Sequence, residues 1–303
     1  MQQTAGTEKQ GVIVKGIGGF YYVYAQEGIY ECRARGRFRY NDMTPLPGDR
    51  VRFAPGKDNK DGYLLAIDER KSQLKRPPVA NVDQLVLVVS ASRPRPDLIL
   101  VDKLLVQAER QGIGALLALN KCDVAEADIA ERVESNYRNL PLTFCRVSAR
   151  QSDGIELLRR QLLDKLSCFA GQSAVGKSSL LNALSHSLAL QTGGLSRKTG
   201  RGKHTTRAIE LRPLDGASHS FVMDTPGFSM LNLDDLLPEE LAGYYPEMQA
   251  YAGQCRFDNC LHVNEPRCAI KAAVEDGQIS KGRYERYLLI LKELQEAQSR
   301  RYR

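Results

Sequence analysis

The chain has 303 residues, and 43 Lys and Arg against 36 Asp and Glu give it a net charge of +7. A hydrophobic share of 42% and a charged share of 26% are those of a folded globular protein and exclude a largely disordered chain. No apolar stretch approaches the roughly 18 residues that cross a bilayer, and the N-terminus lacks the apolar core of a secretory signal. We therefore expect a cytoplasmic protein with no membrane partner.

The basic excess is concentrated in the first quarter of the chain. Residues 1–76 carry 14 basic and 9 acidic side chains, residues 77–236 carry 19 and 17, and residues 237–303 carry ten of each. A polyanionic partner for the first segment and a general solubility bias account for this excess equally well. Seven cysteines in a chain without an export signal indicate thiols or metal ligands rather than disulfides.

Five β-branched and aromatic runs follow one another near the N-terminus, divided by turns rich in Gly, Pro and Asp. They show no helical period, so they predict a small antiparallel β-barrel. The turn at residues 46–51 is typical of OB-like barrels, and Pro77 and Pro78 predict a linker after the last strand. The runs cover residues 11–16, 20–26, 28–36, 50–56 and 63–69.

From residue 84 onward, apolar runs alternate with helical patterns, and Asp97 is placed to cap the first helix. This alternation predicts an α/β domain with a mainly parallel sheet. The last region ends in a charged helix at about residues 281–301 and is expected to be mainly helical. The expected strands cover residues 85–90, 115–119, 142–148, 167–170 and 220–224, and helices are expected over 98–111, near 126–139, after Asp153 and from near Lys177.

A phosphate-binding loop is predicted at Gly171–Ser178, which matches G-x-x-x-x-G-K-[ST] at every fixed position. Its glycines let several backbone N–H groups point at one phosphate, and the helix start adds its positive dipole end. A chance match on a Gly-rich turn is the alternative. We expect Lys177 to reach the β and γ phosphates, Ser178 to bind Mg²⁺, and the nucleotide to be contacted by Gly171, Gln172, Ser173, Ala174, Val175, Gly176, Lys177, Ser178 and Ser179.

An N-K-x-D pattern at the end of a predicted strand, Asn120, Lys121 and Asp123, indicates guanine. The carboxylate of Asp123 can accept from the ring N–H and the amine of guanine, whereas adenine would leave it unpaired at high cost. Asn120 can bond the other edge of the base, and the stem of Lys121 can cover the ring. Ser148 and Ala149, at the end of the next strand, place a backbone N–H near the guanine carbonyl. A chance four-residue match is the alternative.

Two further segments have the character of nucleotide-sensing switches. Asp224, in a D-x-x-G motif, can hold Mg²⁺ through water, and the N–H of Gly227 can meet the γ-phosphate. Residues 191–207 are basic and Gly-rich and offer Thr205 and Thr206 as γ-phosphate and Mg²⁺ contacts. We prefer Thr206, which stands next to Arg207, for the metal; an ordinary flexible loop is the alternative.

Catalysis is assigned to Lys177, Thr206 and His204. The residue after the D-x-x-G motif is Phe228, which cannot orient a water molecule. His204, beside the switch threonines, can do so. A solvent-exposed loop histidine is the alternative.

A metal site is predicted near the C-terminus, where Cys255, Cys260, His262 and Cys268 lie within 14 residues. Three thiolates and one imidazole suit a tetrahedral, structural Zn²⁺. Buried thiols with an unrelated histidine are the alternative. The remaining cysteines, Cys32, Cys122, Cys145 and Cys168, are expected to be ordinary thiols.

The order of the motifs is unusual, because N-K-x-D and Ser148-Ala149 precede the phosphate loop instead of following it. Chain ends can be rejoined at a surface without altering a core, so such a permutation is physically possible. In its motifs the chain closely resembles the RsgA (YjeQ) family of circularly permuted GTPases, which act in bacterial small-subunit assembly. The resemblance is carried by Asn120, Lys121, Asp123, Gly171–Ser178, residues 202–206, Asp224–Phe228 and the cysteine cluster.

The resemblance implies three domains: an RNA-binding OB-fold over residues 1–76, a permuted GTPase over 77–236 and a zinc-binding region over 237–303. It also implies GTP hydrolysis stimulated by the small ribosomal subunit, with that subunit and its rRNA as partners, and release of an assembly factor. We expect a monomer. Two other functions remain open at this point: a nucleic-acid-binding module that holds GTP as a structural ligand, and a P-loop ATPase, against which Asp123 argues.

Overall fold

The computed structural model describes residues 8–34, 44–75, 77–185, 209–214, 220–224, 233 and 235–301. Four predicted site residues, His204, Thr205, Thr206 and Gly227, lie outside these ranges. None of the helices in the described part of the chain is both long and apolar enough to cross a membrane. Contacts group the chain into two compact units, Met1–Gln84 with Arg159–Phe169 and Leu180–Pro226, and Leu85–Leu158 with Ala170–Ser179 and Gly227–Arg303.

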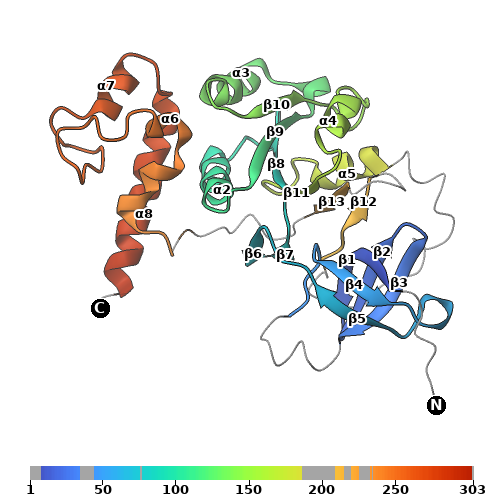
Figure 1. The fold of residues 1–303 in the computed structure, drawn as a ribbon. Coiled ribbons are helices and arrows are strands. Elements are labelled where there is room, and N and C mark those ends of the chain that lie inside the picture. Colours follow the sequence, from blue (N-terminus) through green and yellow to red (C-terminus); the bar gives the residue numbers. More distant parts are fainter. Residues whose placement is uncertain are drawn as a thin grey trace. The chain divides into compact units, whose positions relative to one another are not determined.

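The N-terminal strands close into a barrel in the order β1-β2-β3-β5-β4 (Figure 1). The predicted barrel is confirmed, but it is not wholly antiparallel, because β3 and β5 are parallel. A closed ring with an odd number of strands cannot be antiparallel at every pair, so one parallel pair is unavoidable. The strands are β1 (Lys9–Ile17), β2 (Phe20–Ala25), β3 (Gly28–Ala34), β4 (Arg50–Ala54) and β5 (Gly62–Ile67), with a short 3₁₀ turn η1 (Lys57–Asn59).

The linker expected at Pro77 and Pro78 is in part regular structure. Strands β6 (Gln73–Lys75) and β7 (Pro78–Ala80) pair antiparallel. Proline lacks an N–H and is tolerated at the first residue of a strand, where Pro78 stands. A pattern of prolines alone therefore did not distinguish a linker from a short hairpin.

The second sheet has six strands in the order β10-β9-β8-β11-β13-β12. Pairs β9·β10 and β11·β13 are parallel and β12·β13 is antiparallel, which confirms the mainly parallel sheet. Every residue of β8 is buried, as its continuous apolar run requires of a strand covered on both faces. The strands are β8 (Gln84–Ser90), β9 (Gly114–Asn120), β10 (Thr143–Arg146), β11 (Leu166–Ala170), β12 (Arg212–Pro213) and β13 (Phe221–Asp224).

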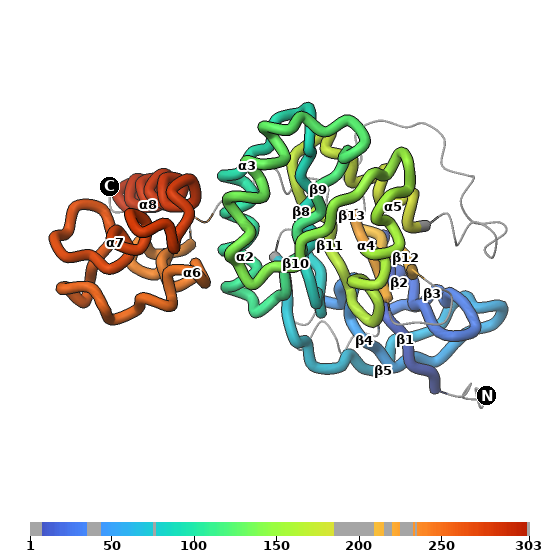
Figure 2. Tube along the Cα trace, turned by 90° about the horizontal axis from the view of Figure 1, so that it is seen from above, coloured from blue at the N-terminus to red at the C-terminus, as the bar shows by residue number. Residues whose placement is uncertain are grey.

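The helices of this region form where they were predicted. The Asp97 carboxylate accepts from the N–H of Leu100 at 3.0 Å and caps α2, as expected. Figure 2 shows α2 and α3 side by side along strands β8–β10, and the Tyr137 hydroxyl of α3 donates to Asp102 of α2 at 2.7 Å. The helices are α2 (Leu98–Arg110), η2 (Cys122–Val124), α3 (Ala127–Tyr137), α4 (Ile155–Gln161) and α5 (Lys177–Ser185).

The C-terminal region is helical and packs its core against α2. Val106 of α2 belongs to the same buried cluster as Tyr245, Tyr287 and Leu291. One hydrophobic core is therefore formed jointly by α2 and the C-terminal helices. These are η4 (Pro238–Tyr244), α6 (Pro246–Gln249), α7 (Ala269–Glu275) and α8 (Lys281–Arg301).

A buried ionic cluster lies at the same junction. Asp102 has no exposed surface, and its two oxygens accept from Arg283 at 2.7 Å and from Arg286 at 2.5 Å. Arg283, 1% exposed, also donates to Glu247. Burial opposes the charge of Arg283, but Asp102 and Glu247 outweigh it and raise the pKa of this guanidinium. Each charged group of the cluster therefore faces an opposite charge, although Glu247 Oε2 and Arg286 Nη2 are buried without a hydrogen-bond partner among the described residues.

Candidate nucleotide-binding site and metal centre

Asn120 is the last residue of β9 and is buried, with 2% of its surface exposed. Its Nδ2 donates to the carbonyl of Val175 at 2.9 Å, and its Oδ1 accepts from the N–H of Ala149 at 3.2 Å. One side chain thus ties the phosphate loop to the segment that follows β10. The amide fixes the relative positions of the predicted base and phosphate contacts.

Lys121 adds a second tie to the phosphate loop. Its backbone is left-handed, with φ of 65°, and its Nζ donates to the carbonyls of Ala174 at 2.9 Å and Arg93 at 2.7 Å. The involvement of Arg93 was not predicted from the sequence. A backbone carbonyl can belong to any residue type, so no motif marks it.

Asp123, the predicted guanine acceptor, is oriented by Ser148. The Ser148 hydroxyl donates to Asp123 Oδ1 at 2.8 Å and accepts from the N–H of Gln151 at 3.1 Å. A carboxylate already held in place loses less conformational freedom when it accepts the two N–H donors of guanine. The serine hydroxyl therefore positions the Asp123 carboxylate, whereas the strand-end pattern indicated only a backbone contact from this segment.

The two loop glycines meet both steric and conformational demands. Gly171 has φ of 143° and Gly176 has φ of 99°, which side chains rarely tolerate. A Cβ at Gly171 would collide with the carbonyl of Val88, and one at Gly176 would collide with the Asn120 amide. The loop therefore needs glycine at both positions to lie this close to β8 and β9.

Lys177 starts α5 and bends over the loop. Its Nζ donates to the carbonyls of Gly171 and Gln172, each at 2.9 Å. The ammonium therefore stands at the loop rim, close to the N-terminal end of α5, where both charge and helix dipole favour an anion. Ser173, Ala174, Ser178 and Ser179 are exposed, and Val175 is buried.

The structure brings most of the predicted nucleotide contacts into one compact unit: Asn120, Lys121, Asp123, Ser148, Ala149 and residues 171–179. Asp224 ends β13 and belongs to the other unit. Hydrogen bonds from Asn120 and Lys121 link the guanine motif directly to the phosphate loop.

The four predicted metal ligands converge in an irregular segment between α6 and α7. The ligand atoms of Cys255, Cys260, His262 and Cys268 all lie within 4.8 Å of one another. The Sγ atoms of Cys255 and Cys268 are 3.9 Å apart, and His262 Nδ1 lies 3.6 Å from Cys255 Sγ and 3.3 Å from Cys268 Sγ. A tetrahedral metal with bonds of about 2.3 Å to sulfur and about 2.05 Å to nitrogen would hold two sulfur atoms about 3.8 Å apart. It would hold a sulfur and a nitrogen atom about 3.6 Å apart. The cluster therefore fits a tetrahedral metal ion.

Helix α8 supports the ligand segment. The hydroxyls of Tyr284 and Tyr287 donate to the carbonyls of His262 at 2.6 Å and Leu261 at 3.0 Å. Burial raises the pKa of the Cys260 thiol to about 12 and lowers the pKa of His262. Both shifts favour the neutral side chains, and a neutral imidazole can ligate a metal directly, whereas a thiol must first lose its proton.

The other four cysteines are free thiols in the structure. Cys32, Cys145 and Cys168 are buried, and Cys122 is half-buried. Burial raises the pKa of Cys32 to about 12 and also raises the pKa of Cys168. These thiols are poor nucleophiles near neutral pH, which agrees with the expectation of ordinary thiols.

Comparisons with known proteins agree with this geometry. Residues 67–234 match the RsgA GTPase family and residues 10–64 match the RsgA N-terminal domain. A relative from Caldanaerobacter subterraneus subsp. tengcongensis, named small ribosomal subunit biogenesis GTPase RsgA, is 46% identical over 97% of this chain and 98% of its own. A relative of the same name from Halalkalibacterium halodurans is 42% identical over 97% of this chain and 99% of its own.

Two solved structures are similar over nearly their whole length. YjeQ from Thermotoga maritima superposes with a TM-score of 0.80 at 36% identity, covering 95% of this chain and 98% of that one. YloQ, described as a circularly permuted GTPase, superposes with a TM-score of 0.79 at 37% identity, covering 98% of both chains. The permuted motif order, the barrel and the sheet thus have counterparts in known proteins, and this chain belongs to the RsgA family of GTPases.

Proposed function

We propose that this protein binds the small ribosomal subunit and assists its late maturation, hydrolysing GTP to GDP and phosphate with stimulation by the subunit. The observation that carries the GTPase proposal is the direct bonding of the guanine motif to the phosphate loop through Asn120 and Lys121. Family membership supports the part played in subunit maturation. Ribosome assembly places the protein in the bacterial cytoplasm, and we propose that it acts there as a monomer.

Catalysis on this scaffold consists of positioning and charge stabilisation. Asp123 binds the base, and the loop amides and Lys177 hold the phosphates. Ser178, Thr206 and Asp224 would hold Mg²⁺, which neutralises charge on the phosphates. Lys177 Nζ now bonds loop carbonyls and would exchange them for phosphate oxygens. We assign orientation of the attacking water to His204.

We propose that the metal of the Cys255, Cys260, His262 and Cys268 cluster is one structural Zn²⁺. The support is chemical: three soft sulfur ligands and one imidazole, at separations expected of a closed tetrahedral site. A site with four protein ligands leaves no position for a substrate. The zinc would therefore shape the segment rather than take part in hydrolysis.

We propose that the three domains have the boundaries expected from the sequence, 1–76, 77–236 and 237–303, and that the basic barrel contacts rRNA. Its charge and its OB-like topology support RNA as the barrel's partner. The C-terminal region carries no net charge and would bind the subunit through shape or local patches.

The decisive experiment measures phosphate release from GTP with and without purified small subunits. We expect slow release from the protein alone and a marked rise with subunits. GTP binding without any release would instead support a nucleic-acid-binding module with GTP as a structural ligand. Equal binding of ATP and GTP would support an ATPase.

Asp123→Asn is expected to weaken GTP binding by about 10- to 100-fold, the equivalent of about 1.5–3 kcal/mol for a charged hydrogen-bonding group. The amide would present an N–H donor, or only one neutral acceptor, to two donors of guanine. Titration with a fluorescent guanine nucleotide measures the effect. Asp128→Asn, on the exposed start of α3, is the matched control and should bind like the parent protein. Similar affinity in both variants would remove Asp123 from the base site.

His204→Ala is expected to lower subunit-stimulated hydrolysis by about 10²- to 10⁴-fold, the range for a positioned acid–base group. GTP affinity should stay within about twofold, because the histidine is assigned to water and not to the nucleotide. His219→Ala, outside every motif, serves as the control. Unchanged turnover in His204→Ala, measured as phosphate release, would exclude His204 from the mechanism.

A further inference from the structure

The barrel strand β1 has an additional hydrogen-bonding partner beyond its barrel neighbours. It pairs with β2 as far as Ile17, but with β4 only over Lys9–Val12. Farther along, Lys15 stands opposite Tyr22 on one edge and opposite Glu210 on the other, in an antiparallel bridge. Residues 209–211 therefore continue the edge of β1 where β4 has ended.

Two contacts hold this added segment. The N–H of Leu211 donates to the carbonyl of Val14 at 2.9 Å, and Lys15 Nζ lies 3.4 Å from Glu210 Oε2. Val14 is 4% exposed and Leu211 is 2% exposed, so their hydrogen bond is shielded from water. The β1·β2 register shifts between Ile13 and Lys15, which leaves Val14 as the extra residue of a bulge. Bulges redirect a strand locally, and here the bulged residue is the one that bonds Leu211.

A second contact joins the barrel to the neighbouring strand. The ring of Tyr24 in β2 meets Phe221 in β13 edge to face, with centroids 5.6 Å apart. Strand β12 pairs with β13 through Arg212 with Val222 and Pro213 with Phe221. The barrel thus holds the start of β13 and the residues that lead into β12.

These contacts lie close in sequence to the predicted switch residues. Glu210 follows Thr206 by four residues, and Phe221 precedes Asp224 by three. The contacts also lie within one compact unit, which combines the barrel with β12 and β13. A displacement of β1 or β2 would therefore reach both switch-flanking strands through a few short connections.

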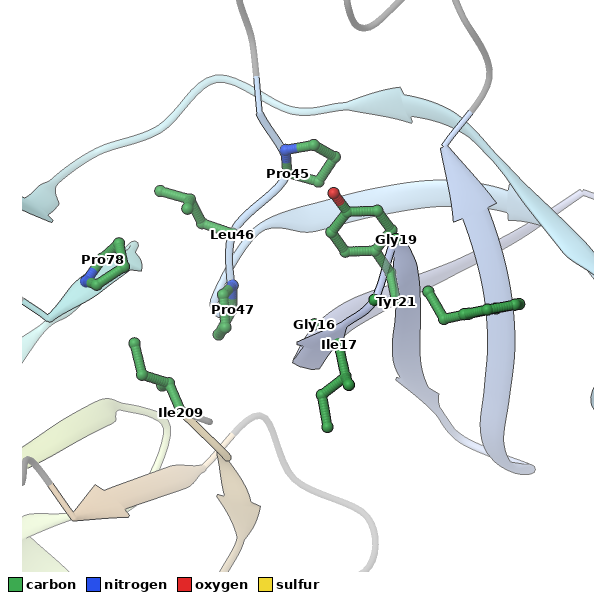
Figure 3. Close-up of a pocket in the computed structure, with 11 residues that line it drawn as sticks. Gly16, Ile17, Gly19, Tyr21, Pro45, Leu46, Pro47, Pro78 and Ile209 are labelled. Carbon is green, nitrogen blue, oxygen red and sulfur yellow. The ribbon is translucent and has the colours of Figure 1, made fainter. Parts of the chain in front are cut away.

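The junction is not packed throughout. A pocket of about 280 Å³ opens beside it, and Figure 3 shows Ile209 on one side of the pocket, facing Pro47 and Ile17 of the barrel. Pro45 and Tyr21 line the barrel side as well. With space on one side, the added segment depends on the Val14 and Lys15 contacts for its position. Elements with few packed contacts are the ones that shift most readily.

We propose that the contacts of Val14 and Lys15 with Glu210 and Leu211 couple RNA binding by the barrel to GTP hydrolysis. This inference rests on the proposed function and names the regulation of that site. Val14, Lys15, Glu210 and Leu211 are positioning residues: RNA on the barrel fixes β1, and β1 fixes the segment after Thr206. Because coupling between two binding sites is reciprocal, the factor by which RNA changes the affinity for the nucleotide is also the factor by which the nucleotide changes the affinity of the barrel for RNA.

The test compares two glutamates that each pair with a lysine of β1. Glu210→Ala breaks the pair at the junction, whereas Glu27→Ala breaks the pair of Glu27 with Lys9, 3.3 Å apart and away from residues 209–214. Both variants remove one exposed acid and leave the basic charge of the barrel intact. We expect Glu210→Ala to reduce the stimulation by small subunits by up to about fivefold, the upper limit for an exposed ion pair. Glu27→Ala should match the parent protein, and hydrolysis without subunits should be the same in all three.

Two further measurements complete the test: reversal of the charges of Lys15 and Glu210, and hydrogen exchange at the backbone amide of Leu211. Glu210→Lys should impair stimulation more strongly, and Lys15→Glu with Glu210→Lys should recover most of it. Hydrogen exchange at the Leu211 amide should be slower with a non-hydrolysable GTP analogue than with GDP, and Glu210→Ala should reduce that difference. Equal stimulation in Glu210→Ala, Glu27→Ala and the parent protein would overturn the coupling. Absence of stimulation in the parent protein would instead contradict the proposed function.

Discussion

Replacing Asp102 with alanine is expected to lower the free energy of unfolding of its compact unit by about 3–5 kcal/mol. The reason is the cost of unpaired buried charge. Arg283 and Arg286 are 1% and 8% exposed, and both donate to the Asp102 carboxylate. The alanine variant leaves these guanidinium groups near Tyr137 and Tyr245 without that anion.

Denaturant unfolding measures the effect, and hydrogen exchange in α8 locates it. Glu293→Ala is the control, because its pair with Lys103 joins the same two helices but leaves Glu293 53% exposed; its cost should stay below about 1 kcal/mol. A fourfold variant, Asp102→Leu with Arg283→Met, Arg286→Met and Glu247→Gln, should recover most of the stability, since it leaves no charge of the cluster unpaired. A loss below about 1 kcal/mol in Asp102→Ala would show that the cluster does not hold the two regions together.

Removing the metal is expected to have the largest effect on the C-terminal region. Apparent binding free energies of structural zinc are about 10–16 kcal/mol near neutral pH, as large as or larger than the roughly 5–15 kcal/mol by which a typical domain is stable. Residues 250–268 contain no regular helix or strand, so we expect metal–ligand bonds to supply much of their order, beside the hydrogen bonds from α8. Chelation should remove hydrogen-exchange protection there, while α8 keeps part of its protection through its buried contacts with α2.

Elemental analysis of the purified protein should find one zinc per chain. Cys260→Ala should reduce that content sharply, whereas Cys145→Ala, at a buried thiol far from the cluster in sequence, should leave it at one. GTP binding should survive chelation, because the nucleotide contacts are held by bonds among Asn120, Lys121 and the phosphate loop. Full protection of residues 255–268 in metal-free protein would contradict a structural role for zinc.

The structural features that could be predicted depend on residues that lie close together in the sequence. The cap at Asp97, the five barrel strands and the buried run of β8 each follow from side chains within one turn or one strand. The loop Gly171–Ser178 and the cysteine cluster can likewise be recognised from residue type and spacing, because binding a phosphate or a metal ion requires particular groups at particular intervals. The geometry at these places agrees with the expectation, although bonds from Asn120 and Lys121 to the loop and from α8 to the ligand segment, which no motif marks, also hold it.

The structural features that could not be predicted depend on which distant segments of the chain pair with one another. Asp102 looks like an ordinary polar position of a helix, yet it is fully buried because two arginines more than 180 residues later meet it. The parallel pairing of β3 with β5 depends on ring closure, and the hairpin at Pro78 depends on which strand lies beside it. The bond between Val14 and Leu211 joins backbone groups that every residue carries.

The sequence by itself therefore indicated the chemistry of this protein: a preference for guanine over adenine, a phosphate loop, a cysteine-rich cluster that fits a metal ion, and the permuted order of these parts. Only the tertiary structure decided how the parts are connected, through Asp102 to the C-terminal helices and through β1 to the segment after the switch threonines. The physical reason is that ligand chemistry selects residue types, whereas burial and pairing between distant segments select only complementary surfaces. Many sequences can provide such surfaces, so the pattern of one chain does not reveal them.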